Sequence, residues 1–126
     1  MAKITGLGGV FHVVKDPAAT RAWYKEYLGL DGEYGPMLRW SEETGDAPYS
    51  LVSHFTDAKY LEPSDKPYMI NFRVDDLDGF IETLKARGLE ILGYSDEGYG
   101  KFAWIMDCDG VKLELWQQVD APPSGR

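Results

Sequence analysis

The carboxylate with the clearest claim to chemistry is Glu114, which lies in the alternating stretch Leu113-Glu114-Leu115-Trp116. Successive side chains of a strand point to opposite faces, so the two leucines share one face and Glu114 shares the other with Trp116. A carboxylate on such a face can act as a general base or anchor a ligand. It can equally be a structural group paired with an arginine, and both interpretations stay open.

A second alternating stretch, residues 69–74, supplies further polar candidates. Met69, Asn71 and Arg73 share one phase. The opposite, helix-facing phase is apolar and consists of Ile70, Phe72 and Val74. The planar guanidinium fork of Arg73 suits a carboxylate or a phosphate, which makes it either a ligand-binding group or the partner of Glu114. Together, Arg73 and Glu114 could polarise a carbonyl and move a proton without a metal.

The chain has only two histidines. His54 shares the phase of Val52, and this makes it a candidate ligand-contacting or acid–base residue on the inner face of its predicted strand. His12 shares the phase of Val10 and Val14 and is predicted to face a helix in a structural role. Cys108 is flanked by two aspartates, whose charge disfavours a thiolate, so we expect no nucleophilic role for it.

Aromatic residues make up 13% of the chain, with four tryptophans. Trp23 falls in a helical pattern and is expected in the core. Trp40, Trp104 and Trp116 fall on predicted strands, and Phe102 shares the phase of Trp104. Aromatic walls with few polar groups suit a flat or apolar organic ligand. The alternative is that a small barrel fills its interior with large side chains.

An internal repeat indicates which elements position these residues. Residues 9–30 align with residues 69–89 at an offset of 60, and one deleted residue late in the second copy brings the final Gly-Leu pairs together. Each copy has an alternating stretch, an aspartate at a helix N-cap, a helical pattern and a glycine where the helix ends. The equivalent pairs are Val14 and Val74, Asp16 and Asp76, Tyr24 and Leu84, and Gly29 and Gly88.

Only strand-like sequence follows each helix. The candidate strands are residues 31–34, 37–41 and 49–55 in the first half and residues 90–94, 99–106 and 111–118 in the second. Residues 56–66 are predicted to connect the halves, and residues 120–126 to form a flexible tail. The sequence therefore predicts a single α+β domain over residues 1–126, built from a module at about 5–58 and a module at about 66–119.

A doubled β-α-β-β-β unit with these motifs resembles the vicinal oxygen chelate superfamily of glyoxalase, bleomycin-resistance and extradiol dioxygenase relatives. The motifs are VKDPAATRAWYKEYLGL at 14–30, INFRVDDLDGF at 70–80 and YGKFAWIMDCDGVKLELW at 99–116. The resemblance implies two βαβββ modules forming a half-open barrel, with Phe102 and Trp104 directed into its cavity. It also implies a homodimer that shares strands between chains. It does not select a reaction, because the superfamily includes both enzymes and binding proteins.

The resemblance also implies where metal ligands would lie. Enzymatic relatives use a histidine on the first strand of each module and a carboxylate or amide on the last. The first-strand positions here are Gly9 and Met69, and only Glu114 maps securely onto a last-strand position. The fourth position falls on Val52 or, with slippage, on Ser50 or His54. Because a catalytic metal normally needs three protein ligands, we expect no metal cofactor; if a divalent metal binds, Glu114 would hold it.

Charge and composition exclude other classes. The chain has 21 acidic and 13 basic residues and a formal net charge of −8, which argues against a nucleic-acid partner. Its longest apolar run is five residues, too short for a membrane span. A single cysteine and no signal-like N-terminus predict a cytoplasmic protein.

The leading functional prediction is a protein that binds a small organic molecule in an aromatic-lined cavity, with the reaction, if any, unassigned. One alternative is a metal-dependent lyase or isomerase of the glyoxalase type. The other is a non-catalytic accessory module that binds a protein partner. We expect Glu114→Gln to abolish ligand binding or turnover while leaving the fold intact.

Overall fold

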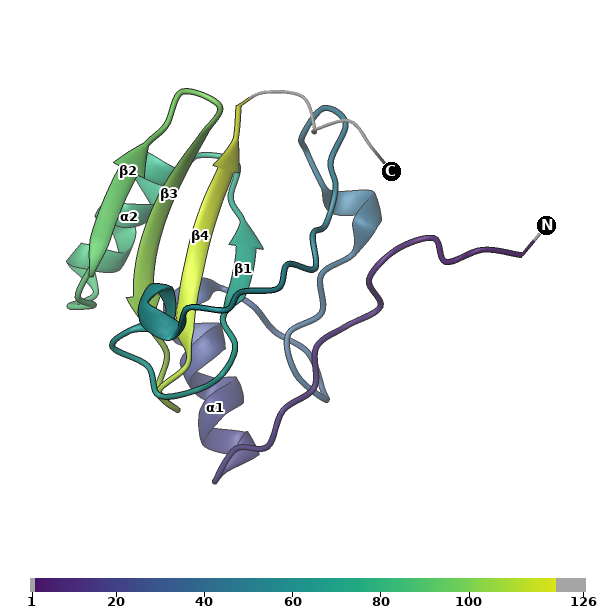
Figure 1. Cartoon of the computed structure of the whole chain (residues 1–126). Coiled ribbons are helices and arrows are strands. Elements are labelled where there is room, and N and C mark those ends of the chain that lie inside the picture. Colours follow the sequence, from purple (N-terminus) through teal and green to yellow (C-terminus); the bar gives the residue numbers. More distant parts are fainter. Residues whose placement is uncertain (1, 120–126) are drawn as a thin grey trace.

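A computed structural model describes residues 2–119 and shows an α+β fold, as predicted (Figure 1). Its helical elements are α1 (Pro17–Trp23), the π-helical turn η1 (Tyr24–Leu28), the 3-10 turns η2 (Trp40–Glu42) and η3 (Ala58–Leu61), and α2 (Leu77–Ala86). Its strands are β1 (Ile70–Arg73), β2 (Gly93–Asp96), β3 (Gly100–Met106) and β4 (Lys112–Gln118). The predicted tail at 120–126 lies outside the described residues.

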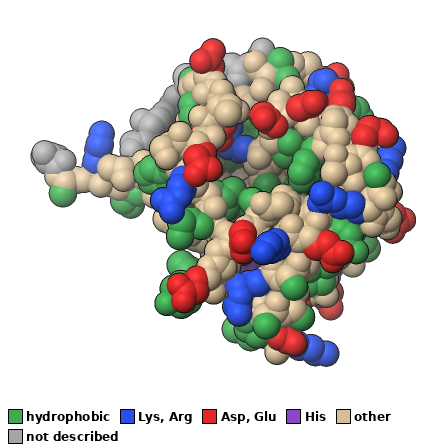
Figure 2. Space-filling view, turned by 180° about the vertical axis from the view of Figure 1, so that it is seen from behind, with side chains coloured by type: hydrophobic (Ala, Val, Ile, Leu, Met, Phe, Trp, Pro, Cys, Tyr) green, Lys and Arg blue, Asp and Glu red, His purple; other side chains and the backbone are tan. Residues whose placement is uncertain are grey.

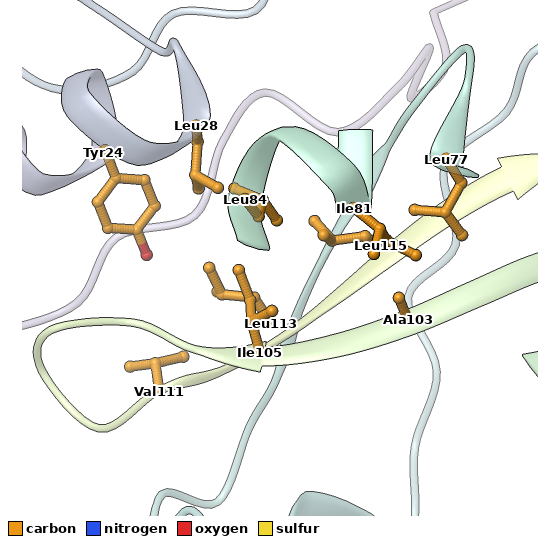
Figure 3. Packing of buried hydrophobic residues seen from close by; sticks show 10 residues of the cluster. All are labelled: Tyr24, Leu28, Leu77, Ile81, Leu84, Ala103, Ile105, Val111, Leu113 and Leu115. Atoms are coloured by element: carbon orange, nitrogen blue, oxygen red, sulfur yellow. The ribbon is translucent and has the colours of Figure 1, made fainter. Parts of the chain in front are cut away.

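The second half folds in the predicted order of strand, helix and three strands. Its sheet has the order β1-β4-β3-β2, in which β1 and β4 are parallel and the other neighbours are antiparallel. Helix α2 covers one face of this sheet (Figure 1). Buried side chains from both layers meet between them (Figure 3): Leu77, Ile81 and Leu84 from α2, and Ala103, Ile105, Leu113 and Leu115 from β3 and β4.

Both helices begin and end as the repeat predicts. The Asp16 side chain accepts a hydrogen bond from the backbone N–H of Ala19 at 3.2 Å, and Asp76 accepts one from Gly79 at 3.2 Å. Each cap satisfies a backbone donor that the first helical turn leaves without a partner. The first helix ends at Gly29, with φ of 70°, and Gly88 follows α2 with φ of 83°, a conformation that favours glycine.

The extra residue of the first copy is absorbed by the π-helical turn η1. The backbone N–H of Leu30 closes on the carbonyl of Tyr24 at 3.2 Å, whereas the equivalent N–H of Leu89 closes on Leu84 at 3.0 Å. The first closure spans one residue more than the second. A π turn accommodates such an insertion without ending the helix, so Tyr24 and Leu28 both stay buried.

The strands expected in the first half do not form within residues 2–119. Residues 10–14, 31–34, 37–41 and 49–55 are extended or irregular but hold no place in a sheet. Figure 1 shows these segments beyond β1, at the outer side of the sheet. Strands are stable only when they pair and bury one face, and the apolar side chains here stay exposed: Ile4, Phe11, Val13, Tyr34, Met37, Leu38, Leu51, Val52 and Phe55.

The helical side of the molecule carries mixed charge. Figure 2 views that side and shows acidic and basic side chains interspersed, with hydrophobic ones between them. No helix among the described residues is long and apolar enough to cross a membrane.

Candidate functional site

The face of the sheet turned away from α2 collects most of the predicted site residues. Strand pairing places them in two rows across β1, β4 and β3. The first row is Asn71, Glu114 and Trp104; the second is Arg73, Trp116 and Phe102. We call these six residues, together with Tyr60, the aromatic face. The rings of Phe102 and Trp104 lie nearly parallel, with centroids 6.5 Å apart.

Glu114 is the centre of this face and is only 8% exposed. Its Oε1 accepts a hydrogen bond from Asn71 Nδ2 at 2.7 Å. Its Oε2 accepts one from the Trp104 indole N–H at 2.8 Å and another from the Tyr60 hydroxyl. Three neutral donors therefore hold the carboxylate, and none of these bonds comes from the arginine partner that the structural interpretation required. Hydrogen bonds to a charged group are the stronger class, so the carboxylate is firmly placed.

Tyr60 is the functional candidate that sequence reasoning missed. It lies on η3, which Figure 1 shows as a short teal turn in front of β3 and β4, on the side opposite α2. Its ring meets Trp104 edge-on at 6.2 Å and Phe55 at 5.4 Å. Burial and the Glu114 hydrogen bond raise the pKa of Tyr60 above its ordinary value, so the hydroxyl keeps its proton. The only sequence signal was an aromatic residue within a polar connection.

Lys112 brings a cation close to Tyr60 and Trp104. Its Nζ donates to the backbone carbonyl of Tyr60 at 2.6 Å. The same Nζ lies 5.2 Å from the centroid of the Tyr60 ring and 5.8 Å from that of Trp104, within cation–π range. Burial lowers the pKa of Lys112 from its ordinary value.

Arg73 is engaged by residues other than Glu114. Its Nε donates to Glu43 Oε2 at 2.8 Å, and its Nη1 donates to Gln118 Oε1 at 2.8 Å. The guanidinium also stacks over Trp116, 4.9 Å from the ring centroid. A Cβ at Gly45 would lie 2.8 Å from Arg73 Nη2, so a side chain at this position would have to displace the guanidinium. Arg73 thus joins the first half of the chain to the second.

Two further candidates lie outside this arrangement. Trp40 is 69% exposed on η2, and its ring lies against Gly6 instead of the aromatic face. His54 is exposed, and no hydrogen bond or ion pair joins it to Glu114. Both predictions assumed strands that do not form within residues 2–119, so alternation gives neither side chain a direction there.

Met69 and His12 lie near β1. Met69 is half-buried immediately before the strand, in phase with Asn71. His12 is half-buried, and its Nδ1 lies 2.7 Å from the Tyr68 hydroxyl. This contact suits the structural role predicted for His12.

Cys108 lies in the turn between β3 and β4. Burial and the charge of Asp109 raise the pKa of its thiol to about 11, in the direction the flanking aspartates predict. In the same turn, Asp107 is buried and accepts a hydrogen bond from the Tyr24 hydroxyl at 2.6 Å, while Thr20 donates to Asp109 at 2.6 Å. The turn therefore fastens the first helix to the second half.

The residues around Glu114 do not fit a divalent metal. Both carboxylate oxygens face N–H or O–H donors, whereas a metal needs neighbouring lone-pair ligands. Within residues 2–119, no group of three or more histidine, cysteine, aspartate or glutamate side chains could hold an ion. An open depression between α2 and β2, lined in part by Asp78, Ile81 and Tyr94, contains none of the predicted site residues.

Comparison with solved structures supports the fold. A glyoxylase/bleomycin resistance protein/dioxygenase domain from Frankia sp. EAN1pec is 24% identical, with a TM-score of 0.53 over 93% of this chain and 96% of that one. TnmS3, an antibiotic binding protein from Streptomyces sp. CB03234, is 25% identical, with a TM-score of 0.52 over 87% and 98%. The fosfomycin resistance protein FosX from Listeria monocytogenes is 23% identical with a TM-score of 0.39; the match covers 44% of this chain and about half of FosX, at 50%.

No curated protein matches the sequence. The family model described as Glyoxalase/Bleomycin resistance protein/Dioxygenase superfamily matches residues 6–115, which include both copies of the repeat and every residue of the aromatic face except Trp116. The resemblance carried by the sequence motifs is thereby confirmed: the chain belongs to the Glyoxalase/Bleomycin resistance protein/Dioxygenase superfamily.

Proposed function

We propose that this protein binds a small, planar organic molecule on the aromatic face of its sheet. One observation carries the proposal: a buried carboxylate, Glu114, is fixed by neutral donors among the rings of Trp104 and Tyr60. Ligand sites combine mostly apolar walls with a few fixed polar groups in this way. The structural similarity to TnmS3, an antibiotic binding protein, supports the same class of function.

Titration with a planar aromatic probe, 1,4-naphthoquinone, tests this proposal. We expect saturable binding by calorimetry and quenching of tryptophan fluorescence. Trp104→Ala should weaken binding about tenfold or more, because it removes both a ring wall and a donor to Glu114. Trp40→Ala is the matched control, since Trp40 is 69% exposed on another surface. Equal losses in the two variants would contradict the proposed location.

We propose further that binding needs no metal ion. The donor set around Glu114 supports this, because its oxygens accept hydrogen bonds on both sides. Elemental analysis of purified protein tests it. Zinc, nickel, manganese or iron at one equivalent per chain would instead favour the metal-dependent lyase or isomerase.

We also propose that the protein acts as a homodimer in the cytoplasm. The exposed apolar side chains of the first half, such as Phe11 at 94% and Val13 at 96%, support self-association, because soluble monomers rarely expose so many together. The exposed, unpaired thiol of Cys108 suits a reducing compartment. Light scattering between about 1 and 100 μM, a range that detects a dimer with a micromolar Kd, measures the mass. A monomer throughout contradicts the dimer, and dissociation by Phe11→Ser supports it.

A further inference from the structure

The geometry points to a ligand that carries a neutral aryl hydroxyl group, which binds Glu114 in the place that the Tyr60 side chain occupies. This inference rests on the proposed function and names the ligand's chemical class. It follows from treating the Tyr60 side chain, a phenol, as the present occupant of the site.

The surroundings of Tyr60 are those of a complete phenol-binding site. Its hydroxyl donates to Glu114 Oε2, and the edge of its ring meets Trp104 at 6.2 Å. The Lys112 ammonium lies 5.2 Å from its ring centroid. The carboxylate thus recognises the hydroxyl of a phenol, the Trp104 ring its edge, and the Lys112 ammonium the face of its ring.

Tyr60 can leave this site without unfolding the segment that carries it. Tyr60 is 44% exposed. The segment is held by other residues: Leu61 is 7% exposed in the core, and the Ser64 hydroxyl donates to the carbonyl of Gly110 at 2.5 Å. The Asp57 side chain accepts from the Lys59 N–H at 2.9 Å and caps the turn. None of these anchors uses the Tyr60 ring.

The two opposite charges at this position favour a neutral ligand, since each of them opposes ligands of its own sign. The Glu114 carboxylate repels a carboxylate or phosphate, and the Lys112 ammonium repels an organic cation. Arg73, the group best suited to an anion, is already paired with Glu43 at 2.8 Å. A neutral hydroxyl on an aromatic ring satisfies the carboxylate and keeps the cation–π contact, so it fits both charges at once.

Paired probes test the inference: 2-naphthol, which has the hydroxyl, and 2-methoxynaphthalene, which lacks the donor. We expect Tyr60→Ala to bind 2-naphthol about tenfold more tightly than the unaltered protein, because the internal competitor is gone. In Tyr60→Ala, calorimetry should show about a tenfold preference for 2-naphthol over the methyl ether. Adding Glu114→Gln should abolish that preference.

Tyr94→Ala is the matched control. Tyr94 is 47% exposed and its hydroxyl also donates to a carboxylate, Asp78, at 3.0 Å, but on the β2 side of the sheet. This variant should bind both probes as the unaltered protein does. Should Tyr60→Ala fail to fold, Tyr60→Leu removes the ring and its hydroxyl with a smaller loss of apolar volume, and the same preference is expected there.

Three outcomes would overturn the inference. Equal affinity of Tyr60→Ala for both probes would reject the hydroxyl while leaving the proposed function intact. Weaker binding of both probes to Tyr60→Ala would show that Tyr60 is a wall of the site instead of its occupant. Absence of binding by either probe to every variant, together with no binding of 1,4-naphthoquinone, would remove the proposed function as well.

Discussion

The two halves of this chain share a helix plan but differ in what surrounds the helix. In the second half, α2 covers a four-stranded sheet and its Leu84 is fully buried. In the first half, η1, which continues α1, buries Tyr24 and Leu28 against that same core, while the segments around these helices form no strands within the described residues. A helix satisfies its own backbone, whereas a strand needs a neighbour. The first half therefore keeps its helix but forms no sheet within the described residues, because its extended segments have no strand partners.

The largest expected effect separates a core position from an exposed one. Leu113→Ala should lower the free energy of unfolding by about 2–5 kcal/mol, because Leu113 is fully buried. Leu51→Ala should change it by less than about 0.5 kcal/mol in the monomer, since Leu51 is 70% exposed. Urea unfolding measures both. A comparable loss at Leu51 would show that the strands of the first half are formed.

The next largest effect on stability is expected at the hydrogen bond between Tyr24 and Asp107, which joins the two halves. Tyr24→Phe removes the hydroxyl from Asp107, a buried carboxylate, and should cost about 1–3 kcal/mol of stability. Tyr27→Phe is the matched control on the same helix, because Tyr27 packs against the core without such a bond. Thermal and urea unfolding of both variants give the difference, and equal stabilities would mean that the hydroxyl contributes nothing.

The two helix caps should contribute equally to the free energy of unfolding. Asp16→Ala and Asp76→Ala each remove one side-chain acceptor from a helix N-terminus and should cost roughly 1 kcal/mol. Urea unfolding measures each, with the exposed Asp46→Ala as control. A cost confined to Asp76→Ala would mean that the first helix is held by packing alone.

The smallest expected effect is pH-dependent. The Arg73 guanidinium holds the pKa of Glu43 below its ordinary value, with both side chains less than a third exposed. A lowered folded-state pKa stabilises the protein above the ordinary glutamate pKa, and this contribution, about 0.2–1 kcal/mol, disappears as pH falls through the folded-state pKa.

Urea unfolding from pH 7 downward should therefore show Glu43→Gln less stable than the unaltered protein at pH 7, with the difference shrinking as pH falls below the ordinary glutamate pKa. Glu42→Gln is the control, because the Glu42 side chain is 73% exposed and lies 3.7 Å from Arg39. An equal loss of stability at pH 7 in Glu42→Gln would show that the Glu43–Arg73 ion pair makes no specific contribution to stability.

Features determined by local sequence could be predicted. The caps Asp16 and Asp76 and the glycines at 29 and 88 follow from neighbouring residues alone. The strands of the second half were predicted because their alternation matched a sheet that has a helix to cover it.

The features that could not be predicted depend on distant contacts. The bond from Tyr60 to Glu114 joins residues 54 positions apart, and no periodicity marks Tyr60. The Glu43 partner of Arg73 lies 30 positions away in an irregular segment. For His54, alternation gave a direction that has meaning only if a strand forms.

The parallel pairing of β1 with β4 also has a consequence for the time course of synthesis. Ile70 pairs with Leu113, which the ribosome adds 43 residues later. At typical elongation rates of about 5–20 residues per second, roughly 2–9 s pass before β4, the neighbour of β1 in the sheet of residues 2–119, is made. The antiparallel pair of β2 and β3 can therefore form before β1 joins the sheet, and the last strand to be made is the one that links β1 to that pair.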